Sequence, residues 1–311
     1  MTVFLFLLCA IAAILLMGGY YTYRIAFYSP KKGRDKISTF ASHKYDPYRK
    51  EINRLFCQLS DRPYEEVSIV SFDGLTLFGR YYHVKDGAPL DIGFHGYRSS
   101  ALTDFAGGSE LSFSMGHNLL LIDERAHGRS EGRTITFGIQ ERWDVESWAR
   151  FAVEQFGADV QIILYGVSMG AATVLMAAGL DLPENVKGII ADCPYSSPGD
   201  IIRKVARDMH MPDRLAWPFV KIGGRVYGSF DVDEMDAARA VKQAMVPILI
   251  IHGESDSFVP CEMSDIVAEN PALITRYTFP GADHGFSYLV DTPRYKKIVT
   301  EFAEKALAPK A

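Results

Sequence analysis

Four short, almost continuously apolar runs constrain the fold of this chain most strongly. A strand that is apolar on both faces must be covered on both faces, as strands of a parallel sheet are. Helical stretches alternate with such runs, and this alternation predicts a mostly parallel sheet flanked by helices. The runs are Asn118–Asp123, Gln161–Tyr165, Val186–Ala191 and Val246–Ile251, and the helical stretches are Gln140–Phe156, Met169–Leu180 and Pro293–Leu307.

Four further runs complete an expected sheet of eight strands. Glu66–Ser71 and Leu75–Val84 flank Asp73-Gly74, a dipeptide typical of hairpin turns. Leu90–Phe94 and Ile274–Phe279 are the remaining two strands. Residues 194–245 contain several prolines and no clear strand, so we expect a helical cap insertion there. Such a cap either lines an acyl pocket or only covers the sheet.

The N-terminal segment indicates a membrane anchor. No charged residue occurs from Val3 to Tyr23, a run of 21 positions. At about 1.5 Å per residue, a helix of this length spans roughly 30 Å, the thickness of a bilayer's hydrocarbon core. The run ends in aromatic and basic residues, as an interfacial belt and a cytoplasmic flank would. They are Tyr20, Tyr21, Tyr23, Arg24, Phe27, Tyr28, Lys31, Lys32, Arg34 and Lys36.

Two alternatives for this segment fit the residues less well. A cleaved signal peptide has a basic n-region and a short apolar core, whereas this run is long and no basic side chain precedes it. A lipoprotein signal has a small residue before its acceptor cysteine, whereas Leu8 precedes Cys9. We therefore expect a single-pass anchor over residues 1–28, a linker with one helix (Asp46–Gln58) over 29–64, and a cytoplasmic catalytic domain over 65–311.

Charge and cysteine usage exclude several classes of function. The formal net charge is −5, which gives the chain no global electrostatic reason to bind nucleic acid. The 4 cysteines are too few and too scattered for a disulfide framework, and none forms a C-x-x-C pair typical of zinc sites. No cluster of His, Asp and Glu has metal-ligand spacing either. We expect neither a metal nor a cofactor.

The pentapeptide Gly166-Val167-Ser168-Met169-Gly170 matches G-x-S-x-G in its proper context. An apolar strand precedes it and an Ala-rich helix follows it, as a nucleophile turn requires. Gly166 and Gly170 lie where a Cβ would clash with the sharp turn. The amide of Met169, at the start of the helix, is placed to receive an oxyanion.

A serine needs a base, and the base needs a third group to orient it. Asp256 lies in a loop after one expected strand, and His284 lies in a Gly-flanked loop after the last one. The order Ser168, Asp256, His284 is that of an α/β hydrolase.

The chain resembles the α/β-hydrolase superfamily over about residues 65–307. Within it, the chain is similar to bacterial serine hydrolases related to carboxylesterases, lysophospholipases and prolyl-oligopeptidase-like peptidases. G-V-S-M-G, H-G-E-S-D-S-F-V-P, A-D-H-G and D-E-R-A-H-G-R-S-E-G carry the resemblance. It implies that Ser168 is the nucleophile, His284 the general base and Asp256 the orienting acid. It also implies a second oxyanion amide at Tyr97, after the His95-Gly96 turn.

The resemblance implies a serine hydrolase acting on an ester through an acyl-enzyme intermediate. The substrate would be a small acyl compound or a lipid. A prolyl-oligopeptidase-like peptidase, an acyl-thioesterase or acyltransferase, and a catalytically inactive scaffold stay open as alternatives, as does the oligomeric state. Asp192 is an alternative position for the acid.

Other polar residues are expected to be structural. Asp123 and His127 would hold the loop in which they lie. His95 and His252 would hydrogen-bond the backbone, and Asp283 would make hydrogen bonds at the surface or within its loop.

Overall fold

The computed structural model describes residues 2–30, 43–268 and 273–309. Its centre is an eight-stranded sheet in the order β1-β2-β4-β3-β5-β6-β7-β8. β2 pairs antiparallel with β1 and β4, and every other neighbouring pair is parallel. The mostly parallel eight-stranded sheet of an α/β hydrolase is thereby confirmed. The strands are β1 (Glu65–Val70), β2 (Thr76–Tyr82), β3 (Leu90–Phe94), β4 (Asn118–Asp123), β5 (Ile162–Val167), β6 (Val186–Asp192), β7 (Ile248–Gly253) and β8 (Ile274–Phe279).

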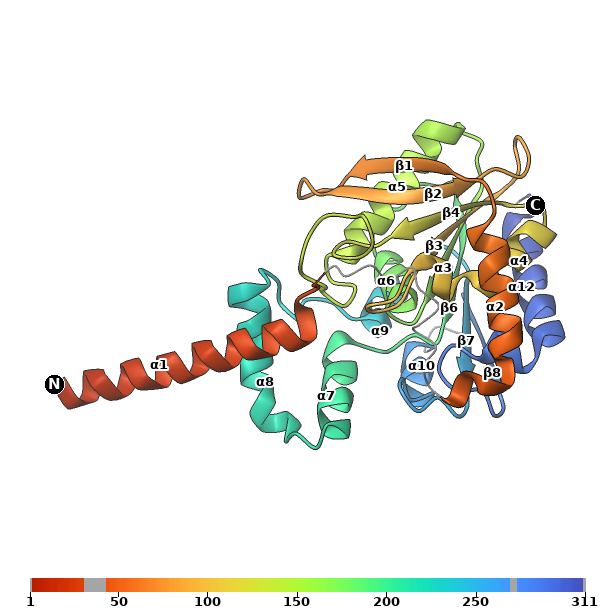
Figure 1. Cartoon of the computed structure of the whole chain (residues 1–311). Helices are drawn as coiled ribbons and strands as arrows, with labels where there is room; N and C mark the ends of the chain where they lie inside the picture. Colours follow the sequence, from red (N-terminus) through yellow and green to blue (C-terminus); the bar gives the residue numbers. More distant parts are fainter. Residues whose placement is uncertain (1, 31–42, 269–272, 310–311) are drawn as a thin grey trace.

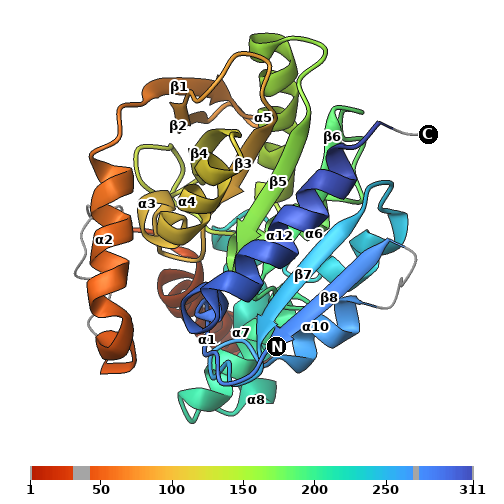
Figure 2. The ribbon, with the colours of Figure 1, turned by 90° about the vertical axis from the view of Figure 1, so that its right-hand side faces the viewer.

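Helices cover both faces of this sheet (Figures 1 and 2). One layer comprises α5 (Glu141–Phe156), α6 (Met169–Ala177), α9 (Ala237–Ala240) and α10 (Glu262–Val267). The other comprises α2 (Arg49–Ser60), α3 (Ala101–Asp104), α4 (Ala106–Ser114), α11 (Ser287–Val290) and α12 (Thr292–Leu307). A short 3-10 helix, η3 (His43–Tyr48), precedes α2.

Alternate side chains of each central strand enter opposite cores. In β4, Leu120 and Ile122 pack with the α5–α6 layer, whereas Leu119 and Leu121 pack with the α2–α12 layer. All four are at most 1% exposed. Successive strand residues point to opposite faces, so a strand between two layers must be apolar throughout. This explains the continuous apolar runs of the sequence.

Residues 194–245 form helices and, within the described residues, no strand. They comprise α7 (Pro198–Asp208), α8 (Asp213–Ile222), the π-helix η4 (Gly223–Tyr227), α9 and the 3-10 helix η5 (Val241–Gln243). α8 packs against the N-terminal helix, and α7 lies beside α8 (Figure 1).

The N-terminal helix α1 (Thr2–Thr22) projects from the rest of the molecule and continues as a π-helix, η1 (Tyr23–Phe27) (Figure 1). Over Thr2–Phe27 it is long and apolar enough to cross a membrane, by length and composition. Most of its side chains are exposed. The basic residues Lys31, Lys32, Arg34 and Lys36, on which the expected topology depends, lie outside the described residues.

The end of the N-terminal helix is packed into the domain that contains the sheet. Phe27 is fully buried, and its ring packs edge-on against Phe137 and Phe230 with centroids 5.9 Å and 5.0 Å away. The backbone oxygen of Phe27 accepts a hydrogen bond from the amide of Ile135 at 2.7 Å. The amide of Ser29 donates to the oxygen of Arg133 at 2.8 Å. Phe27 and Ser29 therefore belong to the folded core, although the sequence analysis places them in the anchor and the linker.

Candidate active site

The expected site residues gather at the carboxyl edge of the parallel strands. Ser168 follows β5, Asp256 lies three residues after β7, and His284 lies in the loop after β8. The carboxyl ends of parallel strands share one edge of a sheet, and ligands bind there in open α/β folds. The fold thus brings together three residues that are far apart in sequence.

Ser168 occupies a strained turn between β5 and α6. Its backbone angles are φ 55° and ψ −113°, which a non-glycine residue rarely adopts. Its amide donates to the oxygen of Asp192 at 2.8 Å, which fixes the turn to the end of β6. A Cβ at Gly166 would overlap the backbone of Gly170, and one at Gly170 would overlap the oxygen of Phe94. Both positions therefore require glycine.

The three side chains form a continuous hydrogen-bonded chain. Ser168 Oγ lies 2.9 Å from His284 Nε2. His284 Nδ1 lies 2.7 Å from Asp256 Oδ2. With the proton on Nδ1, the imidazole donates to Asp256, and its free Nε2 accepts the hydroxyl proton of Ser168. This arrangement allows a proton to leave the serine oxygen for the ring.

Asp256 is held as a carboxylate. Its side chain is fully buried, and burial alone would raise its pKa. Hydrogen bonds from His252 and His284 outweigh burial and hold the pKa well below the usual range. Oδ1 also accepts the backbone amides of Phe258 at 2.9 Å and Val259 at 2.8 Å. The negative charge therefore persists beside the imidazole at any physiological pH.

The loop after β3 lies against Ser168. A Cβ at Gly96 would approach the Cβ of Ser168 to 3.3 Å. The amide of Gly96 donates to Asp104 Oδ2 at 2.7 Å, and the amide of Arg98 donates to His127 Nε2 at 2.9 Å. Tyr97 lies between these two fixed amides. The expected oxyanion donors, Tyr97 N–H and Met169 N–H, thus belong to segments that meet at the serine.

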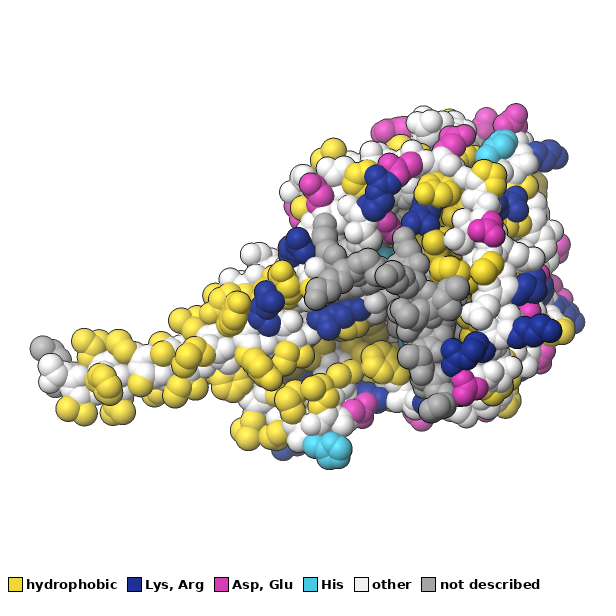
Figure 3. Space-filling view, viewed as in Figure 1, with side chains coloured by type: hydrophobic (Ala, Val, Ile, Leu, Met, Phe, Trp, Pro, Cys, Tyr) yellow, Lys and Arg dark blue, Asp and Glu magenta, His cyan; other side chains and the backbone are white. Residues whose placement is uncertain are grey.

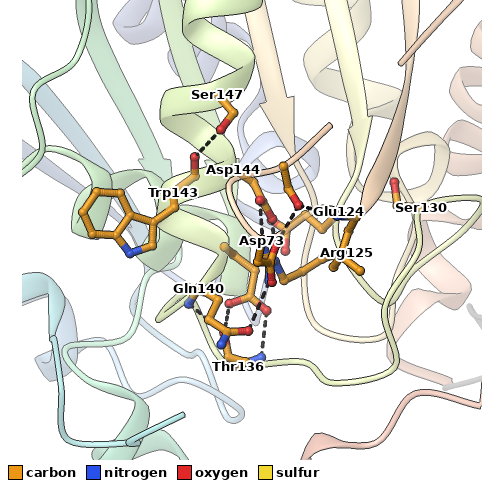
Figure 4. Close-up of polar contacts among 12 residues, drawn as sticks. Asp73, Glu124, Arg125, Ser130, Thr136, Gln140, Trp143, Asp144 and Ser147 are labelled. Carbon is orange, nitrogen blue, oxygen red and sulfur yellow. Dashed lines mark hydrogen bonds and ion pairs between the residues drawn. The ribbon is translucent and has the colours of Figure 1, made fainter. Parts of the chain in front are cut away.

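A buried ion-pair network supports the loop that carries His127 (Figure 4). Arg125 is 2% exposed and binds Asp144 through Nε at 2.6 Å and Asp73 through Nη1 at 2.9 Å. His127 Nδ1 lies 2.9 Å from the backbone oxygen of Arg125. That contact makes Nδ1 the donor and leaves Nε2 to accept the amide of Arg98. The network therefore fixes the loop after β3 through one histidine.

The base of the N-terminal helix contacts this same loop. Tyr97 Oη donates to the backbone oxygen of Ala26 at 2.7 Å. Arg98 Nη2 donates to the oxygens of Ile25 at 2.7 Å and Tyr28 at 3.0 Å. The side chains on the β3 loop thus bind residues 25–28, while its backbone faces Ser168.

A cavity of about 330 Å³ opens beside Ser168 and His284. It is lined mainly by the β3 loop, α3, α4 and the segment around α11, together with Ile52 and Leu55 of α2. No described residue of the 194–245 insertion lines it. The insertion therefore does not form the wall of this cavity, and helix α2 does.

The remaining polar residues have other partners. Asp192 accepts a hydrogen bond from Tyr295 Oη at 2.7 Å, and burial raises its pKa to about 6. Asp283 accepts the amides of Ser257 at 2.8 Å and His284 at 2.9 Å. Asp123 accepts the amide of Arg129 at 3.1 Å. None of these contacts orients the imidazole of His284.

His95 and His252 contact the backbone as expected. His95 Nδ1 lies 2.8 Å from the oxygen of Gly96, and His252 Nε2 lies 2.9 Å from the oxygen of Val259. His252 Nε2 also lies 3.2 Å from Asp256 Oδ2. Sequence analysis missed this second contact, because nothing in the spacing shows that the ring reaches the carboxylate.

Among the described residues, one group of possible metal ligands stands at this site. The donor atoms of Cys193, Asp256 and His284 lie within 4.8 Å of one another. Burial raises the pKa of the Cys193 thiol well above its usual value, so it stays protonated. A metal needs the thiolate, and the histidine and aspartate already bind each other. The group does not fit a metal.

The model of a protein family described as "alpha/beta hydrolase fold" matches residues 93–211. The uncharacterized protein YqkD of Bacillus subtilis is 24% identical over 301 residues, which cover 94% of each chain. The thiohydrolase aneE of Aspergillus aculeatus is 31% identical over 159 residues, 50% of this chain and 48% of its own. The esterase Pf2001 of Pyrococcus furiosus superposes with a TM-score of 0.65 at 20% identity, covering 89% of this chain and 97% of that one.

These similarities agree with the architecture described above. The family match spans β3 to α7 and includes the serine turn and the β3 loop. The solved esterase extends the likeness over nearly the whole chain, at the level of the fold. The similarities described here do not show a relationship to prolyl oligopeptidases.

Proposed function

We propose that this chain, which belongs to the α/β-hydrolase superfamily, is a serine hydrolase that cleaves small carboxylic esters. The observation that carries the proposal is the chain of hydrogen bonds from Ser168 through His284 to Asp256, at 2.9 Å and 2.7 Å. Similarity to an esterase of known structure and to a thiohydrolase supports the same class of reaction.

In the proposed mechanism, Ser168 Oγ attacks the acyl carbonyl while His284 Nε2 takes its proton. The resulting imidazolium donates a hydrogen bond from Nδ1–H to Asp256, whose carboxylate stabilises the positive charge without taking the proton. The backbone amides of Tyr97 and Met169 bind the oxyanion of the tetrahedral intermediate, and each such donor contributes roughly 3 kcal/mol by analogy with a mutated oxyanion-hole side chain.

Collapse of this intermediate releases the alcohol, which leaves with the proton from His284 Nε2, and Ser168 carries the acyl group. Water then attacks the acyl-enzyme while His284 again accepts a proton. The second collapse releases the acid and restores the serine hydroxyl. The ester bond is broken, one water is consumed, and the three side chains return to their starting protonation states.

The cavity limits the size of the acyl group. Its volume of about 330 Å³ is at the small end of the range for ligand pockets, about 300–1,000 Å³. Apolar side chains such as Leu55, Phe105 and Leu289 line it. We therefore expect short acyl esters to be better substrates than long-chain ones.

A thioester is the second candidate substrate. The similarity to a thiohydrolase over half of this chain favours it. The same serine, base and oxyanion donors serve both reactions, because the acyl carbonyl is attacked in the same way.

The test combines active-site labelling with a substrate series. A fluorophosphonate probe should label the wild-type chain but not Ser168→Ala, and Ser168→Ala should lower kcat by about 10⁶, as loss of a serine nucleophile does elsewhere. Rates on p-nitrophenyl esters of increasing chain length, compared with matched acyl-thioesters, then rank the substrates. Full activity of folded Ser168→Ala would exclude the mechanism.

We also propose that α1 anchors the enzyme as a single-pass helix with the catalytic domain in the cytoplasm. The uncharged, exposed α1 supports the anchor, and the basic residues that follow it favour this orientation. A protease added to intact cells should spare a C-terminal tag. Digestion of the tag would reverse the orientation.

A further inference from the structure

The cap insertion packs directly on the N-terminal helix. The ring of Phe219 fills the space where a Cβ at Gly18 would stand, and Ile222 does the same at Gly19. Thr22 Oγ1 donates to the backbone oxygen of Phe219 at 2.8 Å. Only glycines at positions 18 and 19 allow this approach, so α8 and α1 are closely fitted.

The π-helix η4 extends the same contact. Tyr227 Oη donates to the backbone oxygen of Leu16 at 3.1 Å, and its ring packs edge-on against Tyr20 at 5.4 Å. Together α8, η4 and residues 16–22 of α1 form one unit, which we call the platform. Aromatic residues of this kind concentrate where hydrocarbon meets water in membrane proteins.

The platform exposes apolar side chains that no described residue covers. Leu215 is 70% exposed and Val226 is 56% exposed. Met209, which follows α7 outside the platform, is also 52% exposed. In Figure 3, hydrophobic side chains continue from the projecting helix onto the adjacent lower lobe. Large contiguous apolar surfaces of this kind mark interaction sites.

Charged groups around the platform do not oppose contact with lipid. The neighbouring acids are paired with bases: Asp213 with Arg207 at 2.8 Å, Asp231 with Arg225 at 2.5 Å, and Asp233 with Lys221 at 2.5 Å. Arg214 is exposed next to Leu215. An arginine there can extend its head group to the lipid phosphates while its stem lies against apolar surface.

We propose that the platform lies in the membrane interface, with α8 and η4 resting at the boundary between headgroups and acyl chains. This inference rests on the proposed anchoring by α1. Within the platform, α8 and η4 contact α1 between Leu16 and Thr22, the last 9 Å or so of the helix at about 1.5 Å per residue. If α1 spans the hydrocarbon core, α8 and η4 enter it by the 5–10 Å or so typical of interfacial helices.

A bilayer, rather than a protein partner, is the occupant that the structure favours. The exposed apolar surface of α8 and η4 is continuous with that of α1, at the same level along the helix axis. A bilayer that covers α1 as far as residues 16–22 also reaches α8 and η4, which pack against those residues. A single bilayer therefore accounts for the exposed apolar surface of α1 and for that of α8 and η4.

This placement turns the carboxyl edge of the sheet toward the membrane. The β3 loop binds residues 25–28 at the foot of the anchor, and Ser168 lies behind that loop. An ester carried in the bilayer would therefore reach the site without crossing bulk water. The insertion, which lines none of the 330 Å³ cavity, serves to hold the catalytic edge at the lipid surface.

Depth-dependent fluorescence quenching tests the platform on the full chain in phosphatidylcholine–phosphatidylglycerol vesicles. The exposed or partly exposed Cys9, Cys57 and Cys261 are first replaced by serine. Single cysteines for an environment-sensitive nitrobenzoxadiazole label are then introduced by Leu215→Cys, Val226→Cys, Ile11→Cys and Met245→Cys. Ile11 reports on mid-α1, and Met245 is the control, because it is 87% exposed at the opposite edge of the sheet.

The emission maximum of labels at 215 and 226 should shift to the blue. Lipids that carry a shallow 5-doxyl group should quench the fluorescence of these labels. The label at 11 should respond more to a deep 12-doxyl quencher, and the label at 245 to neither. If the label at 11 is quenched while the labels at 215 and 226 behave like the label at 245, the platform does not lie in the membrane interface, although α1 is still an anchor. If 11 is also unquenched, the anchor itself is wrong and the platform falls with it.

Discussion

Replacing Asp256 by asparagine would change which ring nitrogen of His284 carries the proton. Oδ1 of Asp256 accepts two backbone amides, from Phe258 and Val259. An asparagine must keep its oxygen there, because its NH₂ group cannot accept them. The NH₂ group would then face His284 Nδ1 and donate to it. The imidazole would carry its proton on Nε2, where it cannot take the proton of Ser168.

The expected loss is about 10⁴-fold in kcat, as the corresponding change causes in another serine hydrolase with this triad. At 1.36 kcal/mol per tenfold, this equals about 5.5 kcal/mol of transition-state stabilisation. KM should change little, because the carboxylate does not line the cavity. Stability should also fall, since the NH₂ group would face the Nε2–H of His252 as a second donor.

The assay is steady-state hydrolysis of p-nitrophenyl acetate, with circular dichroism to verify folding. Asp283→Asn is the matched control, because Asp283 accepts the amide of His284 but does not touch its ring. The control should stay within about fivefold of wild type, which corresponds to the loss of one partly exposed ion pair with Lys44. Folded Asp256→Asn with kcat within tenfold of wild type would refute the tautomer argument.

Three further outcomes follow from burial and close packing. Gly170→Ala should lower the free energy of unfolding by at least about 3 kcal/mol, since its Cβ would overlap the oxygen of Phe94, and an unchanged urea midpoint would contradict this. Asp192 has a folded-state pKa of about 6 against about 4 when unfolded, so the folded state holds more protons between these values and stability falls as pH rises through that window. Asp192→Asn should flatten this decline by roughly 2 kcal/mol, measured by urea unfolding at pH 4 and pH 7; an equally steep decline would show that another group causes it. Phe27→Ala should lower the free energy of unfolding in detergent by about 3–5 kcal/mol. Ile14→Ala, at an exposed position of α1, should leave this free energy almost unchanged. Equal losses for the two variants would mean that Phe27 is not a core residue.

The parts of the fold that follow local rules could be predicted from sequence. β3 (Leu90–Phe94), β4 (Asn118–Asp123) and β8 (Ile274–Phe279) have the predicted bounds. The turn at Ser168 was also predictable, because two glycines at fixed spacing between a strand and a helix leave few alternatives. The structure brings Ser168, Asp256 and His284 together, while their catalytic roles stay a prediction.

Other features depend on tertiary contacts that no local pattern shows. α3 and α4 are not predicted from the sequence, and Gly107 and Gly108 within α4 disfavour a helix. The ring of Tyr288 occupies the space beside Gly107, so packing requires the glycine there. β7 begins at Ile248, two residues later than predicted, since Pro247 has no amide to donate to a neighbouring strand. Part of the cavity wall comes from Ile52 and Leu55 of α2, a helix assigned to the linker, because only the folded chain shows what α2 covers.

Because Phe27 and Ser29 are buried in the rest of the molecule, a break in the chain after them would leave the N-terminal helix attached by noncovalent contacts. A protease that cut between Pro30 and His43 would leave two pieces, but Phe27 would still be seated between Phe137 and Phe230. Tyr97 and Arg98 would still donate hydrogen bonds to the backbone oxygens of Ala26, Ile25 and Tyr28. The nicked protein would behave as a noncovalent pair of complementing fragments, and a soluble, shed form would have to lose the support beneath its β3 loop.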